Sequence, residues 1–149
     1  MREPVDLGVF VAVRNEAGAY LVVKHNYGDR KWSLPGGGVD QGEIINLTAL
    51  RELGEETGFE GKIGNIIGIF SLRKKRGVVV LIECKIVGGC RKSHNNNTEI
   101  SASEWRRPND FIKDEIYPGQ LNLLFQAEKF HCDRETIYGH LTPDLIVTV

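Results

Sequence analysis

Residues 36–61 read GGGVDQGEIINLTALRELGEETGFEG, and this stretch decides the fold. Its central part has the residue types of a helix, which the sequence predicts to begin at Ile45 or Asn46. Thr57 is the expected last residue, because Gly58 is of the type that commonly follows a final helical turn. The stretch opens with three consecutive glycines, which indicate a sharp change in chain direction.

The predicted helix carries three glutamates close together, at Glu52, Glu55 and Glu56. Carboxylates three and four residues apart share a helix face and repel each other. Gly54 weakens the helix further, by about 1 kcal/mol relative to alanine. Arg51 lies four residues before Glu55 and can offset part of the repulsion through an ion pair. Stability alone therefore does not explain this helix.

The opposite side of the same helix is predicted to pack on the core. On a helical wheel, Leu50, Leu53, Asn46 and Thr57 gather on an arc away from the glutamates. Three convergent carboxylates form a hard-oxygen site, which suits magnesium or manganese better than zinc. The alternative is a solvated acidic face, which explains the glutamates but not the glycine-rich turn before them.

The spacing across the whole stretch follows a known pattern. After Gly37 come five residues, then Glu43, then seven residues, then RELGEETGF at 51–59. This closely resembles the signature box of the Nudix (MutT-like) hydrolases, G-x5-E-x7-R-E-U-x-E-E-x-G-U, in which U is a bulky aliphatic or aromatic residue. Every fixed position is filled. The run WSLPGG at 32–37 and the pair Glu104-Trp105 also look similar to the family.

The resemblance implies a fold class, which is α/β (α+β). The chain is expected to form an α/β/α sandwich, with a central mixed β-sheet between helices. A single domain is expected over residues 1–149, with the Nudix box at 37–59. One position departs from the family, which often has Ser or Thr just after the glutamate that matches Glu43. Ile44 and Ile45 stand there instead, so Asn46 is expected to cap the helix.

The rest of the chain is predicted to form mainly strands. The expected strands are Val5–Arg14, Tyr20–Lys24, Trp32–Leu34, Gly61–Leu72, Gly77–Val87 and Glu99–Trp105, and the expected further helices are Asn109 or Asp110 to Ile116 and Pro118–Phe130. The first two strands are expected to form a hairpin. The glycines at 36–38 are expected to break the chain rather than form a strand. Residues 140–149 could be a strand or an ordered tail.

By resemblance, the chain is a magnesium-dependent pyrophosphohydrolase, with manganese as a possible replacement. Such enzymes cleave the diphosphate of a nucleoside diphosphate linked to another moiety, and ADP-ribose or a nucleoside triphosphate is the expected substrate. The implied metal ligands are Glu55, Glu56, a backbone carbonyl of Gly37, and Glu52 unless it serves as the base. Glu43 and Arg51 are expected to organise the site through a salt bridge.

A fourth acidic residue is expected from outside the box, because the family often supplies one from a loop. Glu99 is the first candidate and Glu104 the second, and a surface carboxylate remains the alternative for Glu99. The predicted catalytic residues are thus Arg51, Glu52, Glu55 and Glu99. Which glutamate is the base stays open.

Candidate substrate contacts lie in two basic segments. Arg30, beside Lys31, lies in the segment before the box. Arg73 and Arg76 are the first and last residues of the run RKKR at 73–76. This run could instead be a solvated hairpin tip. Trp32 could stack on a base or pack beneath the sheet. His25 and Tyr27 are expected at the loop surface, although either could touch substrate.

The composition narrows the class of protein. A chain of 149 residues with 41% hydrophobic residues can bury one core. Its net charge of −1 gives no basic field for nucleic acid, and no apolar run is long enough to span a membrane. Three cysteines without a C-x-x-C pair suggest reduced thiols in a cytoplasmic protein.

Two other functions remain open at this stage. One is a non-catalytic Nudix module that senses nucleotides, and the other is an enzyme that removes a nucleic-acid cap. The intact glutamates weigh against the first, and the net charge weighs against the second. A homodimer is possible, because the apolar tail Leu141–Val149 could contribute an exchanged strand.

Overall fold

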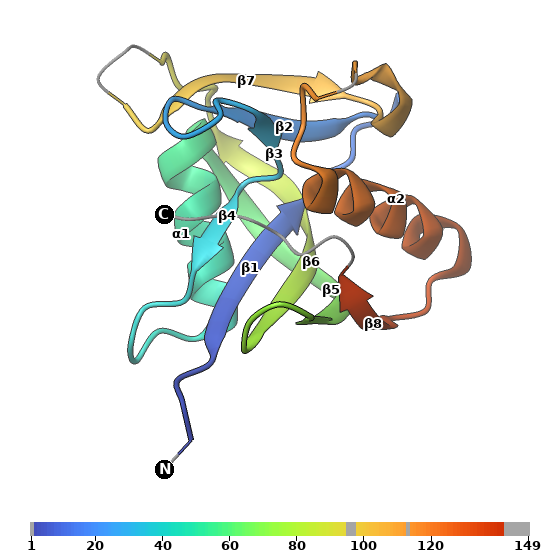
Figure 1. Ribbon diagram of the computed structural model, residues 1–149. Coiled ribbons are helices and arrows are strands. Elements are labelled where there is room, and N and C mark those ends of the chain that lie inside the picture. Colours follow the sequence, from blue (N-terminus) through green and yellow to red (C-terminus); the bar gives the residue numbers. More distant parts are fainter. Residues whose placement is uncertain (1, 95–97, 113, 142–149) are drawn as a thin grey trace.

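The computed structural model describes residues 2–94, 98–112 and 114–141 (Figure 1). Two sheets and two α-helices make up the fold. In chain order the elements are β1 Asp6–Ala12, β2 Tyr20–His25, β3 Trp32–Ser33, β4 Gly36–Gly38, α1 Ile45–Thr57, β5 Phe59–Leu72, β6 Gly77–Gly89, β7 Ile100–Arg106, the 3-10 helix η1 Pro108–Asp110, α2 Pro118–Asp133 and β8 Ile137–Leu141.

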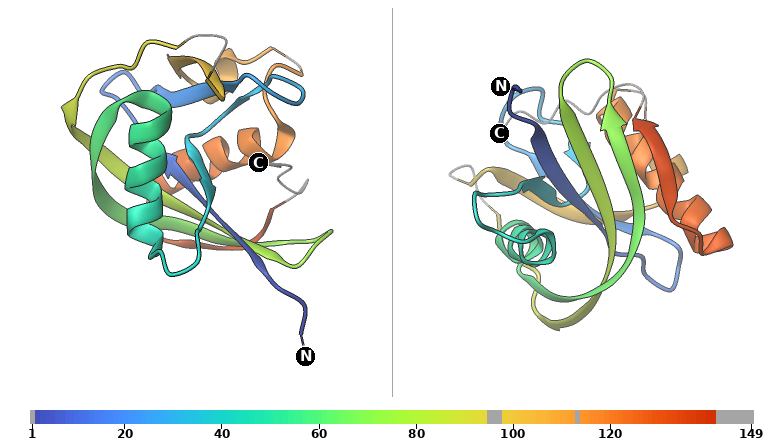
Figure 2. Two further views of the ribbon diagram at one scale, coloured as in Figure 1. Left: turned by 90° about the vertical axis from the view of Figure 1, so that its left-hand side faces the viewer. Right: turned by 90° about the horizontal axis from the view of Figure 1, so that it is seen from below.

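A five-stranded mixed sheet forms the centre, in the order β4-β1-β6-β5-β8. Strand β1 is buried on both faces from Val9 to Ala12, because its alternate residues enter two different cores. Val9 and Val11 pack with Leu53 of α1, whereas Phe10 and Ala12 join the core that contains α2. The helices therefore cover opposite faces of this sheet (Figure 2), which confirms the predicted α/β/α sandwich.

A second, three-stranded antiparallel sheet has the order β3-β2-β7. The predicted hairpin between the first two strands is therefore correct only at its turn. Arg14 and Tyr20 form an antiparallel bridge, and the Leu21 N–H donates to the Val13 carbonyl. Beyond this point β1 pairs with β6 while β2 pairs with β7, so the two strands enter different sheets.

Helix α1 begins at Ile45 and ends at Thr57, as predicted, but its N-terminal cap differs from the prediction. Gly58 has a φ of 85° and its N–H donates to the Gly54 carbonyl, which closes the last turn. The expected cap by Asn46 is wrong, because Ile44 is the N-cap residue and no side chain caps the helix. Asn46 is exposed, and Thr48 takes a place in the buried face instead.

Two further predictions of local structure were wrong. The glycines at 36–38 do not break the chain but form β4, which pairs antiparallel with β1. The helix expected to reach Ile116 is only the short η1, which ends because Phe111 is extended, with φ −86° and ψ 135°. The Asp110 carboxylate accepts a hydrogen bond from the Arg107 N–H and closes this single turn.

The C-terminal strand β8 pairs in parallel with β5, from Gly68↔Ile137 to Leu72↔Leu141. Its last residue, Leu141, is fully buried. The rest of the apolar tail, 142–149, lies outside the described residues, so the exchanged strand proposed for a dimer stays a prediction.

Replacing Gly54 by alanine is expected to raise the free energy of unfolding by about 0.5–1 kcal/mol. An added Cβ would lie 3.8 Å from the Phe59 carbonyl oxygen, which is an ordinary contact, so only the entropy of the unfolded chain changes. Urea unfolding measures the difference. The control is Gly58→Ala, where the positive φ and a Cβ 2.3 Å from the Cys90 carbonyl oxygen predict a loss of stability. Equal effects of the two changes would contradict this prediction.

Candidate functional site

The glycines of β4 bring the chain into direct contact with α1. Gly37 pairs with Val9 of β1 and is buried. A Cβ at Gly37 would lie 2.7 Å from Glu52 Oε1 and 2.9 Å from its Cδ. A side chain at residue 37 would therefore push the Glu52 carboxylate out of this position. The structure thus places the first fixed residue of the box against its central glutamate.

Glu56 is the carboxylate most removed from water. The N–H of Gly36 donates to Glu56 Oε1 at 2.7 Å, which fixes one of its two oxygens. Burial raises the pKa of Glu56 well above its ordinary value, the Gly36 hydrogen bond partly opposes this, and the charges of Glu52 and Glu99 raise the pKa further. A positive charge in this position would relieve both the burial penalty and the repulsion.

Glu52 has a raised pKa for related reasons. Burial is the largest cause, Arg51 opposes it, and the neighbouring charges of Glu55 and Glu99 add to it. Arg51 Nη1 donates to Glu52 Oε1 at 2.8 Å and to Glu55 Oε2 at 3.3 Å. The predicted four-residue pair with Glu55 is present, and Arg51 also bonds the adjacent glutamate.

Arg51 bonds Glu43 through two parallel hydrogen bonds. The distances are 2.8 Å from Nε to Oε2 and 3.0 Å from Nη2 to Oε1. These bonds, followed by one from the Thr48 hydroxyl, lower the pKa of Glu43 to about 2. Glu43 therefore stays ionised and fixes the guanidinium beside Glu52, which is the expected organising salt bridge.

Glu99 reaches the same place from the other sheet. The Asn26 N–H donates to the Glu99 carbonyl at 2.7 Å, and this bond continues the pairing of β2 with β7. Glu99 lines two pockets of about 340 and 250 Å³, and both are also lined by the three glutamates of α1. Glu104 lines neither of these pockets. Its carboxylate instead accepts a hydrogen bond from Arg106 Nε at 2.8 Å.

Three further residues at this site were missed or undervalued by sequence reasoning. Tyr27 lines the larger pocket, and burial with the charges of Glu56 and Glu99 raises its pKa to about 12. Asp40 lines the same pocket, while Lys92 lines the smaller one and its ammonium group donates to the Glu55 carbonyl at 2.9 Å. Tyr27 and Lys92 reach the site through packing between distant segments, so no local sequence signal marks them, whereas Asp40 lies within the box and pairs with Arg51 at 3.5 Å.

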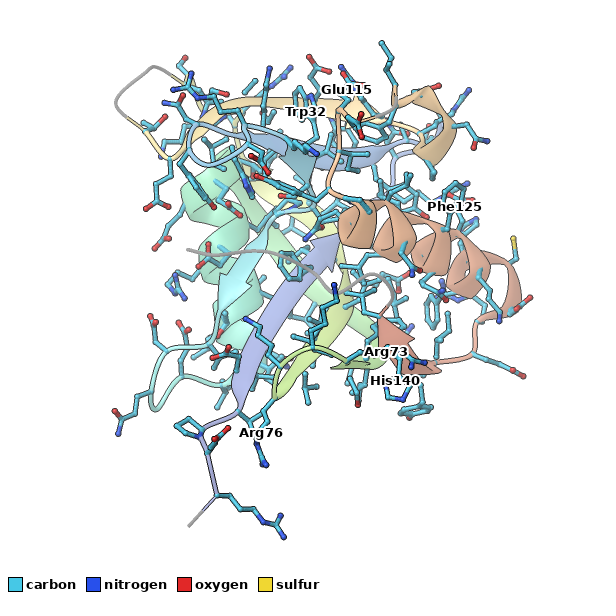
Figure 3. All side chains as sticks on the ribbon, viewed as in Figure 1. Trp32, Arg73, Arg76, Glu115, Phe125 and His140 are labelled. Carbon is cyan, nitrogen blue, oxygen red and sulfur yellow. The ribbon has the colours of Figure 1, made fainter. Side chains whose placement is uncertain are left out.

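The predicted substrate contacts are not gathered together. Trp32 is 4% exposed and packs in the core beneath Arg106, so the structure favours packing over stacking on a substrate. Arg30 is exposed on the loop that carries Tyr27. Arg73 and Arg76 lie at the tip of the β5–β6 hairpin, far from Trp32 and Glu115 in Figure 3. Neither arginine lines the carboxylate pockets, which supports the solvated hairpin tip.

The carboxylate site offers the ligands of a hard divalent cation. Glu52, Glu55, Glu56 and Glu99 supply oxygen only, which is the donor set that magnesium and manganese prefer. Within the described ranges, no three His, Cys, Asp or Glu side chains already form a metal-binding group. Since Arg51 bonds Glu52 and Glu55, side-chain rotation must accompany metal binding. The residues present therefore fit a cation, but not as a preformed cage.

A family model described as the NUDIX domain matches residues 4–126, which is most of the chain. The chain belongs to the Nudix family. This confirms the resemblance expected from the spacing of residues 37–59. The family generally uses divalent metals, in agreement with the ligands gathered at the carboxylate site.

Several Nudix proteins are similar in sequence. The chain is 36% identical over 105 residues to a putative 8-oxo-dGTP diphosphatase of Bacillus subtilis (strain 168), covering 68% of this chain and 66% of that protein. It is 32% identical over 94 residues to the human diphosphoinositol polyphosphate phosphohydrolase 3-beta, covering 62% of this chain and 57% of the relative. The chain thus spans less than two thirds of the length of these relatives.

Solved Nudix structures share the fold. An ADP-ribose pyrophosphatase from Streptococcus suis has a TM-score of 0.77 and 26% identity, with 91% of this chain and 99% of that chain covered. A UDP-X diphosphatase has a TM-score of 0.72 and 22% identity, with 93% and 68% covered, and shows likeness of fold alone. In the part of the chain that the structure describes, no helix is long and apolar enough to cross a bilayer.

The protein is expected to become less stable as the pH falls, because His25 is buried rather than at the loop surface. Its Nε2 is 2.9 Å from Ser33 Oγ, its ring stacks on Tyr27, and burial lowers its pKa to about 4. The stabilising contribution is complete above pH ~6.5, the unfolded value, and decreases as the pH falls towards 4, because only the unfolded chain then binds the proton. The loss amounts to at most about 3 kcal/mol.

Urea unfolding between pH 4 and 7 measures this effect. His25→Gln should unfold with a smaller decrease in free energy over that range, since the carboxylates titrate in both proteins. The control His131→Gln, at an exposed position, should keep the wild-type slope. A His25→Gln slope equal to that of wild type would show that this histidine does not cause the pH dependence.

Proposed function

We propose that this chain is a magnesium-dependent pyrophosphohydrolase that cleaves the diphosphate of a nucleotide-type substrate. Manganese is an alternative cofactor, and residues 1–149 form a single catalytic domain. The observation that carries the proposal is the pocket in which three glutamates of α1 meet Glu99 beside the glycines of β4. The proposal is supported by the family and by the names of its relatives, which include diphosphatases and pyrophosphatases.

The charge of the pocket determines which chemistry is possible. Four carboxylates repel an anionic diphosphate, so the pocket cannot accept that group without a cation. The glutamates of α1 would hold a divalent cation, which would supply neutralisation of the phosphate oxygens and activation of a water for attack. Cys90 and Cys132 are exposed free thiols, which is compatible with the reducing cytoplasm where we place the enzyme.

The glutamates have different roles in this proposal. Glu56 is the best positioned metal ligand, because Gly36 fixes one oxygen and leaves the other for the pocket. Glu52 and Glu55 are the other side-chain ligands, and Arg51 orients them through its pair with Glu43. The Gly37 carbonyl is a further candidate ligand. These assignments give each fixed acidic or basic residue of the box a task.

Glu99 is assigned as the base that takes a proton from the attacking water. Within residues 2–94, 98–112 and 114–141, its carboxylate makes no hydrogen bond or ion pair with the protein. The other three carboxylates are each bonded to Arg51 or Gly36. A base must keep a free oxygen within reach of water, and Glu99 is the residue of the four in which neither carboxylate oxygen is bonded to the protein.

Two substrate classes are favoured, namely ADP-ribose and (deoxy)nucleoside triphosphates. The Streptococcus and Bacillus relatives are named for members of these classes. Tyr27 lies at the edge of the larger pocket, with Arg30 exposed on the same loop. This loop is therefore our candidate for contact with the part of the substrate beyond the cleaved phosphates.

The test is turnover of a substrate panel with magnesium. The panel contains nucleoside triphosphates, 8-oxo-dGTP, ADP-ribose, nucleotide sugars, dinucleoside polyphosphates and a diphosphoinositol polyphosphate. With the preferred substrate, Glu56→Gln and Glu99→Gln are each expected to lower kcat by roughly 100-fold or more, because each removes a metal ligand or the base. Glu104→Gln removes the same charge from the same strand region outside the pockets, and should change kcat less than twofold.

Two results would count against the proposal. Equal losses in Glu99→Gln and Glu104→Gln would show that Glu99 has no special role in the reaction. Binding of a nucleotide from the panel without turnover, with either magnesium or manganese, would favour the nucleotide-sensing module instead.

A further inference from the structure

A second cavity, of about 610 Å³, lies away from the carboxylate site. It is formed by the end of β1 with the following turn, the middle of β5 and β6, and the C-terminal half of α2. It shares no lining residue with the pockets around the glutamates. The volume lies within the range of natural small-molecule sites. In Figure 2, α2 lies away from α1, across the sheet.

Tyr20 provides a buried polar group in the wall of this cavity. The residue is 1% exposed, and its hydroxyl has no hydrogen-bond partner among the described residues. The hydroxyl lies beside the Arg14–Glu128 ion pair, and burial, followed by the interaction with Glu128, raises the pKa of Tyr20. A buried hydroxyl without a partner is unfavourable by about 1–3 kcal/mol. A ligand in the cavity would supply the missing partner.

Two lysines oppose each other across the cavity wall. Lys62 of β5 and Lys85 of β6 are direct cross-strand partners, and both line the cavity. Like charges directly opposite on neighbouring strands are unfavourable. The described residues include no carboxylate paired with either lysine. Two neighbouring ammonium groups without a paired carboxylate are a donor set that suits an anion.

The other charged groups of the wall are largely neutralised. Arg134, at the end of α2, holds Glu83 of β6 through two hydrogen bonds of 2.9 and 3.2 Å, and its guanidinium stacks 4.6 Å from the Phe130 ring. Arg14 pairs with Glu128 at 3.1 Å. The two lysines therefore face only Glu16 among the lining carboxylates that lack an ion pair.

The inner part of the cavity is apolar. Ile67, Ala127 and Phe130 line it and are each at most 3% exposed. The β5–β6 pairing shifts register between Ile63 and Ile66 beside the cavity, and such bulges are frequent at binding sites. An occupant should thus combine an apolar body with an acidic group.

We propose that this cavity is a second ligand site, which binds a small organic anion with an aromatic or aliphatic body. The acidic group lies between Lys62 and Lys85, the body packs against Phe130 and Ala127, and the Tyr20 hydroxyl donates to a polar atom of the ligand. The site is separate from the proposed catalytic pocket, and its occupation does not require the glutamates of α1.

The test uses 8-anilinonaphthalene-1-sulfonate as probe, because it joins an aromatic body to a sulfonate and fluoresces in apolar surroundings. Titration of the full chain should give saturable binding of one probe per chain. Lys62→Glu and Lys85→Glu should each weaken binding by roughly tenfold or more, as expected when attraction to the anion becomes repulsion. Tyr20→Phe, which removes only the hydroxyl, should weaken it by about threefold to tenfold.

Lys129→Glu is the matched control. Lys129 is exposed on α2 and does not line the cavity. Its replacement by glutamate makes the same change in net charge, so binding should stay within twofold of wild type. Amide chemical shifts give the location, and the probe should perturb β5, β6 and the end of α2 rather than Gly36–Gly38. All variants replace exposed lysines or delete one oxygen, so circular dichroism should confirm that each is folded.

The proposal is overturned by any of three results. These are binding that does not saturate, equal weakening by Lys62→Glu and Lys129→Glu, and chemical-shift changes centred on Gly36–Gly38. The last would place the probe in the catalytic pocket.

Discussion

The mutual repulsion of carboxylates gathered in one pocket is the constraint on which the rest of this structure depends. Glu52, Glu55 and Glu56 approach each other on one helix, and Glu99 adds a fourth charge from the opposite sheet. The raised pKa values of Glu52 and Glu56 record the cost of burying these charges together. The fold must therefore hold the carboxylates in place against a force that separates them.

Three devices hold this arrangement. Arg51 bonds Glu43 with two hydrogen bonds and places its remaining N–H groups on Glu52 and Glu55. The Gly36 N–H holds Glu56, and the absence of a side chain at Gly37 lets the strand approach Glu52. The side chains in these devices belong to fixed positions of the Nudix box, and so does Gly37. Gly36 lies just before the box and contributes only its backbone N–H. Function rather than stability accounts for them.

The central sheet separates two different environments. Its α1 face carries the carboxylates at the level of β4, and its α2 face carries the lysine-rich cavity between β5, β6 and the end of α2. The alternation of side chains along β1 and β6 makes this possible, because each strand serves one core on each face. One protein can thus present an anionic and a cationic pocket without bringing their charges together.

Much of this could be predicted from local sequence. The limits of α1 follow from helix periodicity and from Gly58, and the ion pair of Arg51 with Glu43 follows from the family pattern. The strand at Gly36–Gly38 was missed, because a glycine run normally signals a turn, and pairing with β1 overrides that tendency. The side chain of Asn46 does not cap α1, since the helix begins without any side-chain cap.

The parts that could not be predicted depend on contacts between distant segments. Glu99 enters the site through the pairing of β2 with β7, which joins residues more than seventy positions apart in sequence, as the Asn26–Thr98 hydrogen bond shows. Trp32 is of a residue type that can stack on a base, but it lies in the core because α2 and Arg106 pack around it. The Lys62–Lys85 pair likewise exists only once the register of β5 and β6 is known.

The most direct test of the central claim is urea unfolding of wild type and Glu56→Gln, each with EDTA or with Mn²⁺. If a divalent cation relieves the repulsion, Mn²⁺ should stabilise wild type by about 2.7 kcal/mol at a concentration of 100 times Kd. Glu56→Gln should be at least as stable as wild type in EDTA but gain much less from Mn²⁺. Equal stabilisation of both proteins by Mn²⁺, or none in wild type, would contradict the claim that these glutamates exist to bind a cation.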